Sequence, residues 1–158
     1  MKIYCDGACS GNPGTGGYGV VIMNDEETKV IKTITHQELS TTNNIQELKA
    51  LIHAFSYALV LNDKHFTIYS DSAYAINTFT LWAKKWKENG WLKSDNKPIK
   101  NLDLIIKGYE IFENLSNCEI VKVKGHAENI GNELADALAA NNMVKFNKYM
   151  EKIHNLKN

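Results

Sequence analysis

Four acidic residues lie where the local sequence does not favour a charge. Asp6 interrupts an otherwise apolar strand-like segment, and Asp71 follows directly on another. Glu47 begins a row of small and apolar residues at helical spacing, and Asp136 lies inside an apolar helical run. Taken singly, each acid fits a turn, a helix cap or a solvated position. Taken together they are costly to bury without partners, so the set indicates a site.

The chemistry of such a site depends on whether the acids converge. If the strands that carry Asp6 and Asp71 are parallel neighbours, about 4.8 Å apart, their carboxylates converge. Converging carboxylates cannot all stay ionised without a counter-charge. Either one is protonated, as in an acid–base pair, or cations neutralise the cluster. Oxygen ligands favour Mg²⁺ and Mn²⁺ over zinc, and two such ions about 4 Å apart can stabilise a phosphodiester displacement.

The elements that must position these acids begin with strands. Residues 2–8, 18–23 and 30–35 predict three strands, and the turn-forming stretches 10–17 and 24–27 separate them. Short connections favour an antiparallel meander. The glycines of the first turn also suggest a phosphate-binding loop, but no Gly-Lys-Ser/Thr follows, so the turn is the better interpretation.

The rest of the chain alternates helices with strands, which implies right-handed parallel crossovers. We expect an α/β domain with a mixed five-stranded sheet, three antiparallel strands and then two parallel ones, flanked by helices. Thr42, Asn43 and Asn44 are all good N-caps for the longest helix, and Asn43 with Gln46 has capping-box spacing. The predicted helices cover about 43–61, 72–80, 101–115 and 130–142, with strands at 65–71 and 118–124 and a C-terminal helical extension at 143–158.

A basic segment, residues 82–100, separates two of the predicted helices. Its lysines attract phosphates, and tryptophan faces can pack on sugars or bases. The alternative is a solvated amphipathic helix with its tryptophans in the core; we favour the core for Trp86 and a nucleic-acid contact for Trp82. The segment holds Lys84, Lys85, Lys87, Lys93, Lys97 and Lys100 against Glu88 and Asp95, with Trp82, Trp86 and Trp91 between them.

Composition limits the class of protein. The 158 residues, 44% of them hydrophobic, suffice for one domain with its own core. The 18 basic and 18 acidic residues cancel, so a nucleic-acid partner would need a local patch. No apolar run approaches the roughly 18–20 residues that span a bilayer, so we expect no membrane partner. The three cysteines, with no signal-like start, favour a reducing cytoplasm over disulfides or a thiolate metal site.

Five motif blocks together carry a family resemblance that none carries alone. They occur in order over about residues 2–142, and the chain thereby resembles bacterial type 1 ribonuclease H. The blocks are YCDGACSGNPG at 4–14, TTNNIQEL at 41–48, YSDSAY at 69–74, VKGHA at 123–127 and NELAD at 132–136.

The resemblance implies an RNase H-like fold and a Mg²⁺-dependent endonuclease that hydrolyses the RNA strand of an RNA–DNA hybrid, leaving 5′-phosphate and 3′-hydroxyl ends. Two Mg²⁺ ions, or Mn²⁺ in their place, would be held by the family's carboxylate set, which falls on Asp6, Glu47, Asp71 and Asp136. His126 would assist proton movement or the release of product and metal. The alternative interpretation is that His126 is an exposed loop histidine with an ordinary pKa.

The resemblance also implies contacts with both strands of the hybrid substrate. Cys9, Asn12, Asn43 and Asn44 would face the RNA, although turn and cap roles account for Asn12 and Asn43 equally well. The segment 82–100 resembles the family's basic protrusion, which grips the DNA strand. The residues implied for the DNA are Trp82, Lys84, Lys85 and Lys87, with Thr42 and Asn101 in a pocket for a DNA phosphate.

Two positions depart from the family pattern. Ala73 stands where close relatives often have a glutamine that reaches the RNA, and Leu104 stands where some have a tryptophan of the DNA channel. Neither touches the carboxylates.

From this resemblance we expect a monomer with a ribonuclease H catalytic domain at 1–142 and an extension at 143–158. Its expected tasks are the removal of primers and R-loops during DNA replication. Two other functions fit parts of the pattern: a transposase, integrase or resolvase core, and a non-catalytic hybrid-binding module. The first usually carries extra binding domains, and the second would be expected to have lost at least one of the four acids.

Overall fold

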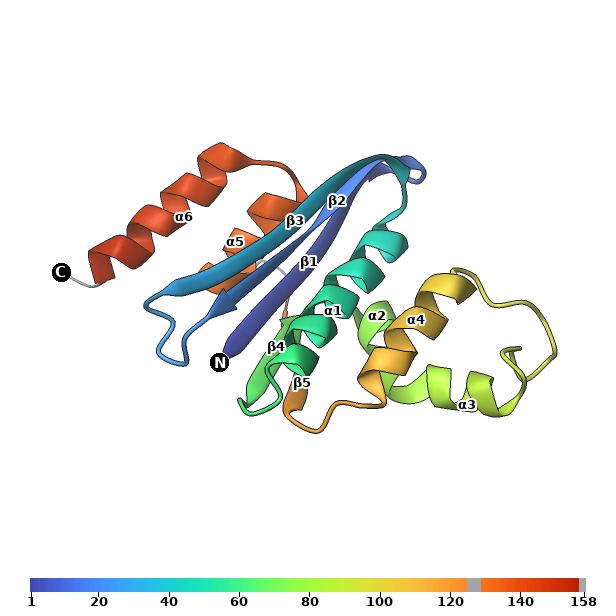
Figure 1. Ribbon diagram of the computed structural model, residues 1–158. Coiled ribbons are helices and arrows are strands. Elements are labelled where there is room, and N and C mark those ends of the chain that lie inside the picture. Colours follow the sequence, from blue (N-terminus) through green and yellow to red (C-terminus); the bar gives the residue numbers. More distant parts are fainter. Residues whose placement is uncertain (125–128, 157–158) are drawn as a thin grey trace.

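The sheet has the mixed architecture that the sequence predicts. The computed structural model describes residues 1–124 and 129–156. Its sheet has five strands in the order β3-β2-β1-β4-β5, with antiparallel pairs among the first three and parallel pairs for the rest (Figure 1). The strands are β1 (Lys2–Gly11), β2 (Gly14–Met23), β3 (Val30–Thr41), β4 (Phe66–Ser70) and β5 (Cys118–Lys122).

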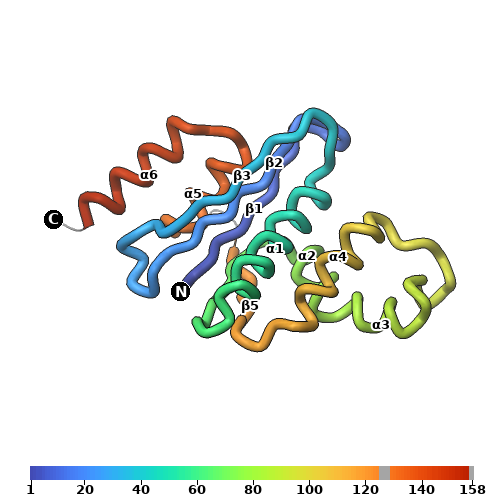
Figure 2. The backbone as a smooth tube through the Cα atoms, in the orientation of Figure 1, coloured from blue at the N-terminus to red at the C-terminus, as the bar shows by residue number. Residues whose placement is uncertain are grey.

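Helices cover both faces of this sheet. Helix α1 lies across one face with α4 outside it, whereas α5 packs on the opposite face and α6 packs on α5 (Figure 2). No helix in the described part of the chain is long and apolar enough to cross a membrane. The helices are α1 (Asn43–Val60), α2 (Ala73–Asn77), α3 (Ala83–Glu88), α4 (Leu102–Phe112), α5 (Ile130–Ala139) and α6 (Met143–Leu156), with a π-helical turn, η1 (Thr78–Trp82), between α2 and α3.

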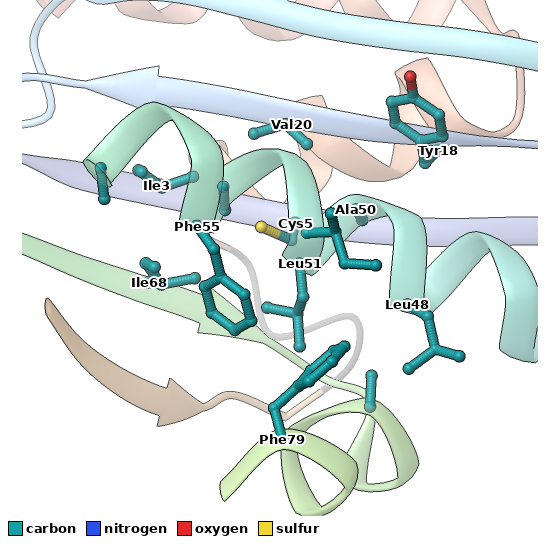
Figure 3. Close-up of a cluster of buried hydrophobic side chains, with 14 of the residues drawn as sticks. Ile3, Cys5, Tyr18, Val20, Leu48, Ala50, Leu51, Phe55, Ile68 and Phe79 are labelled. Atoms are coloured by element: carbon teal, nitrogen blue, oxygen red, sulfur yellow. The ribbon is translucent and has the colours of Figure 1, made fainter. Parts of the chain in front are cut away.

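Strand β1 is buried on both faces, because each face of the sheet has its own core. Successive side chains of a strand point to opposite faces, so Ile3 and Cys5 enter the core under α1 while Tyr4 enters the core under α5. The larger core includes Leu51, Phe55 and Phe79 (Figure 3). The burial of both faces explains why a charge at Asp6 stands out in the sequence.

The first hairpin is longer than predicted. The stretch 10–17, expected to be a turn, is mostly strand: β1 runs to Gly11, β2 resumes at Gly14, and only Asn12 and Pro13 form the turn. Backbone pairing between β1 and β2 extends the strands, because the antiparallel register continues through the pair Cys9 and Gly16 to the turn. A Cβ at position 16 would overlap the carbonyl oxygen of Ala8, so the glycine permits this close pairing.

The observed boundaries of the helix predicted at 72–80 and of the basic segment also differ from the expected ones. Helix α2, the turn η1 and α3 follow one another without a break, and an irregular loop then leads to α4. The expected C-terminal helix is α6, and it packs on the smaller core through Phe146, Tyr149, Met150 and Ile153.

Candidate active site

Strand register brings the first two acids together. Strands β1 and β4 are parallel, and Cys5 pairs with Ser70, so Asp6 and Asp71 follow at neighbouring positions where β4 ends. Asp6 is only 7% exposed. Carboxylate oxygens of Asp6, Glu47 and Asp71 all lie within 4.8 Å of one another. The convergence expected from the strand pattern is therefore present.

Helix α1 presents Glu47 to this pair. The hydroxyl of Thr42 accepts a hydrogen bond from the Ile45 N–H at 3.2 Å, so Thr42 is the N-cap. Of the three candidate caps, Thr42 is thus the one used, although the capping-box spacing pointed to Asn43. Asn43 is already helical, and its N–H donates to the Asn12 side chain at 3.0 Å. With the cap at Thr42, Glu47 lies in the second turn and reaches Asp6 in the middle of β1.

Gly7 allows this close approach of α1 to β1. A Cβ placed on Gly7 would overlap the backbone of Gln46 and Glu47, whose positions the helix fixes. Any larger residue would push the start of α1 away from the strand. The glycine that follows Asp6 thus sets the distance between Asp6 and Glu47.

Helix α5 contributes the fourth acid. The side chain of Asn129 accepts a hydrogen bond from the Asn132 N–H at 3.0 Å and caps the helix. Gly19 on β2 and Gly131 on α5 leave no room for a Cβ, so the helix lies directly on the sheet. Asp136 consequently enters the same cleft, where its charge helps to raise the pKa of Asp6.

The cleft is small and polar. Its volume is about 350 Å³, and it gathers side chains from β1, α1, α5 and the end of β4. Its lining consists of Asp6, Gly7, Asn43, Asn44, Glu47, Asp71, Ser72, Asn132, Glu133 and Asp136.

Electrostatics in the cleft oppose full ionisation. Burial, followed by repulsion from Glu47, raises the pKa of Asp6 above its ordinary value of 3.8. Burial and the charge of Asp71 raise the pKa of Glu47 above 4.5, although a backbone hydrogen bond from Gly7 offsets part of this. The Oε2 atom of Glu47 is buried and has no hydrogen-bond partner among the described residues. A site with an unpartnered carboxylate oxygen on Glu47 and raised pKa values for Asp6 and Glu47 fits a hard divalent cation.

Two charged residues of the site were missed by sequence reasoning. Glu133 lines the cleft, and Lys145 of α6 lies 2.7 Å from its Oε2 atom and 2.6 Å from Oδ2 of Asp136. Glu133 precedes Asp136 by three residues, which places both on one face of a helix, so helical spacing could have identified it. Lys145 has no such signal, because the turn between α5 and α6 determines its position.

Three of the residues expected to face RNA lie at or beside the carboxylate cleft. Asn43 and Asn44 line the cleft itself, and the hydrogen bond from Asn43 to Asn12 joins the tip of the β1–β2 hairpin to α1. Cys9 turns its sulfur toward the backbone, 2.7 Å from the Gly11 carbonyl oxygen, and lines a separate hollow. The structure therefore joins the three asparagines, but not Cys9, to the site.

Two of the residues expected to face DNA, Trp82 and Asn101, line a second hollow. Asn44 belongs to both hollows and so connects them. Trp86 packs against the larger core, while Trp82 lies between Tyr74 and Trp86 with ring centroids 6.3 and 5.8 Å away. This second hollow, of about 430 Å³, is lined by Asn44, Tyr74, Trp82, Trp86, Lys93, Ser94, Ile99, Lys100 and Asn101.

The other residues expected to face DNA do not line this hollow. Lys84 and Lys85 are exposed, whereas Lys87 pairs with Glu113 at 3.0 Å. Thr42 uses its hydroxyl as the cap of α1. His126 lies outside the described residues.

The structure describes both residues that depart from the family pattern. Ala73 is exposed at the start of α2, and Leu104 of α4 is half-buried beside Asn101 in a shallow depression. Leu104 also packs against the larger core.

The sequence and the fold have known counterparts. The RNase H family model matches residues 1–144. Ribonuclease H of Thermoanaerobacter sp. strain X514 is 48% identical over 140 residues, 88% of this chain and 86% of that protein. LC9-RNase H1, a type 1 RNase H, superposes with a TM-score of 0.71 at 27% identity, covering 89% of this chain and 70% of that one.

A more distant fold neighbour has been solved with a nucleic acid. The foamy viral protease–reverse transcriptase in complex with an RNA/DNA hybrid gives a TM-score of 0.78 at 22% identity, over 89% of this chain and 19% of that chain. Fold, site and sequence agree: the chain belongs to the RNase H family and is a nuclease of that family. The resemblance carried by the five motif blocks is confirmed.

Replacing Gly7 with alanine should separate α1 from β1. Because the added methyl group meets backbone atoms, we expect Gly7→Ala to lower the free energy of unfolding by about 3 kcal/mol, at the upper end for overpacking. Gly90→Ala is the control: its φ is +66° but nothing lies within 4 Å, so strain alone should cost about 1 kcal/mol. Urea unfolding measures both. A Gly7→Ala cost no larger than that of Gly90→Ala would contradict the close-approach argument.

The raised carboxyl pKa values make the metal-free protein sensitive to pH. When folding raises the pKa of an acid, the folded protein loses stability as the pH rises from the acid's unfolded pKa, near 4, toward its folded pKa. Asp6→Asn removes this penalty, so in chelator at pH 8 it should be more stable than wild type by about 1–3 kcal/mol. The gain should disappear near pH 4. Asp63→Asn, at an exposed position, is the control; an Asp6→Asn protein no more stable than this control at pH 8 would refute the electrostatic account.

Proposed function

We propose that this chain is an endoribonuclease that hydrolyses the RNA strand of RNA–DNA hybrids, leaving 5′-phosphate and 3′-hydroxyl ends. The observation that carries the proposal is the convergence of Asp6, Glu47 and Asp71 within 4.8 Å, with Asp136 in the same cleft. Membership of the RNase H family supports it.

The four acids are proposed as ligands of two divalent cations, Mg²⁺ by preference and Mn²⁺ as a substitute. When bound, such ions acidify a water and neutralise charge on the phosphate. Asp6 contributes from the centre of the group, because it contacts or repels each of the other three acids. Asp71 and Asp136 hold opposite sides from β4 and α5, and Glu47 approaches from α1. We assign to His126 assistance with proton movement or release of product.

Hybrid recognition is proposed along the two connected hollows. On the RNA side, the amides of Asn12, Asn43 and Asn44 and the backbone near Cys9 can both donate to and accept from hydroxyls, as reading a 2′-OH requires. On the DNA side, an indole face and exposed ammonium groups suit a sugar and its phosphates. We assign that side to Trp82, Lys84, Lys85, Lys87, Thr42 and Asn101. The foamy viral neighbour, solved with an RNA/DNA hybrid, has the same fold.

The remaining assignments follow from the same proposal. Residues 1–142 would form the catalytic domain with a basic protrusion at 82–100, and 143–158 a C-terminal helical extension. We propose that the protein acts as a monomer in the cytoplasm, on primers and R-loops that accompany DNA replication.

Substrate choice tests the proposed activity directly. End-labelled RNA–DNA hybrid, duplex DNA and duplex RNA are incubated with the protein in Mg²⁺ or in chelator. We expect nicking of RNA in the hybrid alone, only with Mg²⁺, and ends that carry a 5′-phosphate. Asp71→Asn should lower the rate by at least about a thousandfold while hybrid binding persists, because it removes a metal ligand. Equal cutting of duplex DNA would favour a transposase-like enzyme, and binding without cutting would favour a non-catalytic module.

The basic segment should govern affinity for the substrate. Changing Lys84, Lys85 and Lys87 to alanine removes three ammonium groups, so we expect a higher KM with a flatter salt dependence and a kcat within about twofold of wild type. The control changes three exposed lysines elsewhere, Lys29, Lys32 and Lys64. If KM rises equally in both triple variants, net charge rather than a local grip explains the effect.

A further inference from the structure

Lys145 brings the C-terminal helix into contact with the carboxylate cleft. Its Nζ atom lies 2.6 Å from Oδ2 of Asp136 and 2.7 Å from Oε2 of Glu133, and the three side chains are 24%, 32% and 11% exposed. One ammonium group thus pairs at once with one of the four proposed ligands and with a second acid of the cleft. In substrate-free protein this group supplies positive charge on the Asp136 side of the site.

The backbone that carries Lys145 is held firmly in place. The side chain of Asn142 accepts a hydrogen bond from the Lys145 N–H at 3.1 Å, and the Asn142 N–H donates to the Ala137 carbonyl at 2.8 Å. Beyond this turn, Ile153 of α6 is only 3% exposed in the smaller core, which Phe146 also contacts. The turn and the packing together aim Lys145 at α5, so the contact is a product of the fold.

The Lys145 ammonium group and a divalent cation held by Asp136 would compete for one carboxylate. Two positive charges a few ångströms apart repel strongly in a partly buried site. Glu133 lowers the cost of replacing Lys145 by a cation at Asp136, because Lys145 can leave Asp136 and remain paired with Glu133. The geometry is therefore that of a displaceable counterion.

We propose that Lys145 is a resident counterion of Asp136 that a divalent cation must displace, so that helix α6 weakens cation binding on this side of the site. The inference rests on the metal site of the proposed function. It makes Lys145 a positioning residue that acts through Asp136, and it assigns the C-terminal helix a part in controlling occupancy of the site.

Calorimetric titration of Mn²⁺ into chelator-stripped protein, without nucleic acid, tests this inference. Lys145→Met keeps the aliphatic stem but removes the charge, so its Kd for Mn²⁺ should fall about tenfold. Lys145→Gln, a second neutral variant, should shift the Kd in the same direction. Lys145→Arg keeps the charge and should stay within about threefold of wild type. Lys148→Met, on the exposed side of the same helix, is the matched control and should not change the Kd.

The possible outcomes separate the two proposals. Tighter binding in both neutral variants supports the counterion, because damage to the fold would not strengthen a metal site. An unchanged or weaker Kd in Lys145→Met, with normal Mn²⁺ binding by wild type, overturns the counterion alone. Absence of Mn²⁺ binding in wild type and every variant overturns the metal site of the proposed function, and the counterion with it.

Discussion

Repulsion among buried carboxylates is the interaction around which this molecule is organised. Five acids line one cleft, and packing rather than mutual attraction holds them there. Two cores, one on each face of the sheet, supply that packing, and β1 contributes to both. Glycines at the contacts, Gly7 for α1 and Gly19 for α5, allow helix backbones to approach the sheet closely. The stability of the fold therefore sustains an arrangement that is unfavourable without cations.

The proposed hydrolysis of a hybrid follows from where the acids lie relative to the hollows beside them. Asn44 belongs to both the carboxylate cleft and the hollow beside Trp82, so one surface runs from the acids to the basic segment. Amide side chains of Asn43 and Asn44 line the carboxylate cleft, and indoles with lysines line the neighbouring hollow. A duplex with chemically different strands suits this asymmetry, because only one strand carries the 2′-hydroxyls that amides recognise.

Much of the fold and of the carboxylate set could be predicted from sequence because their signals are local. An acid at the end of an apolar strand, as at Asp71, identifies a sheet edge, and alternation of strands with helices identifies the parallel half of the sheet. Signals that depend on partners were missed. The extended hairpin around Gly16 needs its antiparallel neighbour to be recognised as strand, and Lys145 needs the turn after α5 to bring it to Asp136. Thr42 and Asn43 are both good caps, and only the contact from Asn12 decides between them.

Anomalous scattering from a crystal soaked in Mn²⁺ tests the central claim most directly, because it locates the ion independently of any activity. The account predicts a manganese peak within coordination distance of Asp6 and of at least one of Glu47 and Asp71. Manganese found only at surface carboxylates, with these three side chains unchanged at saturating Mn²⁺, would contradict it.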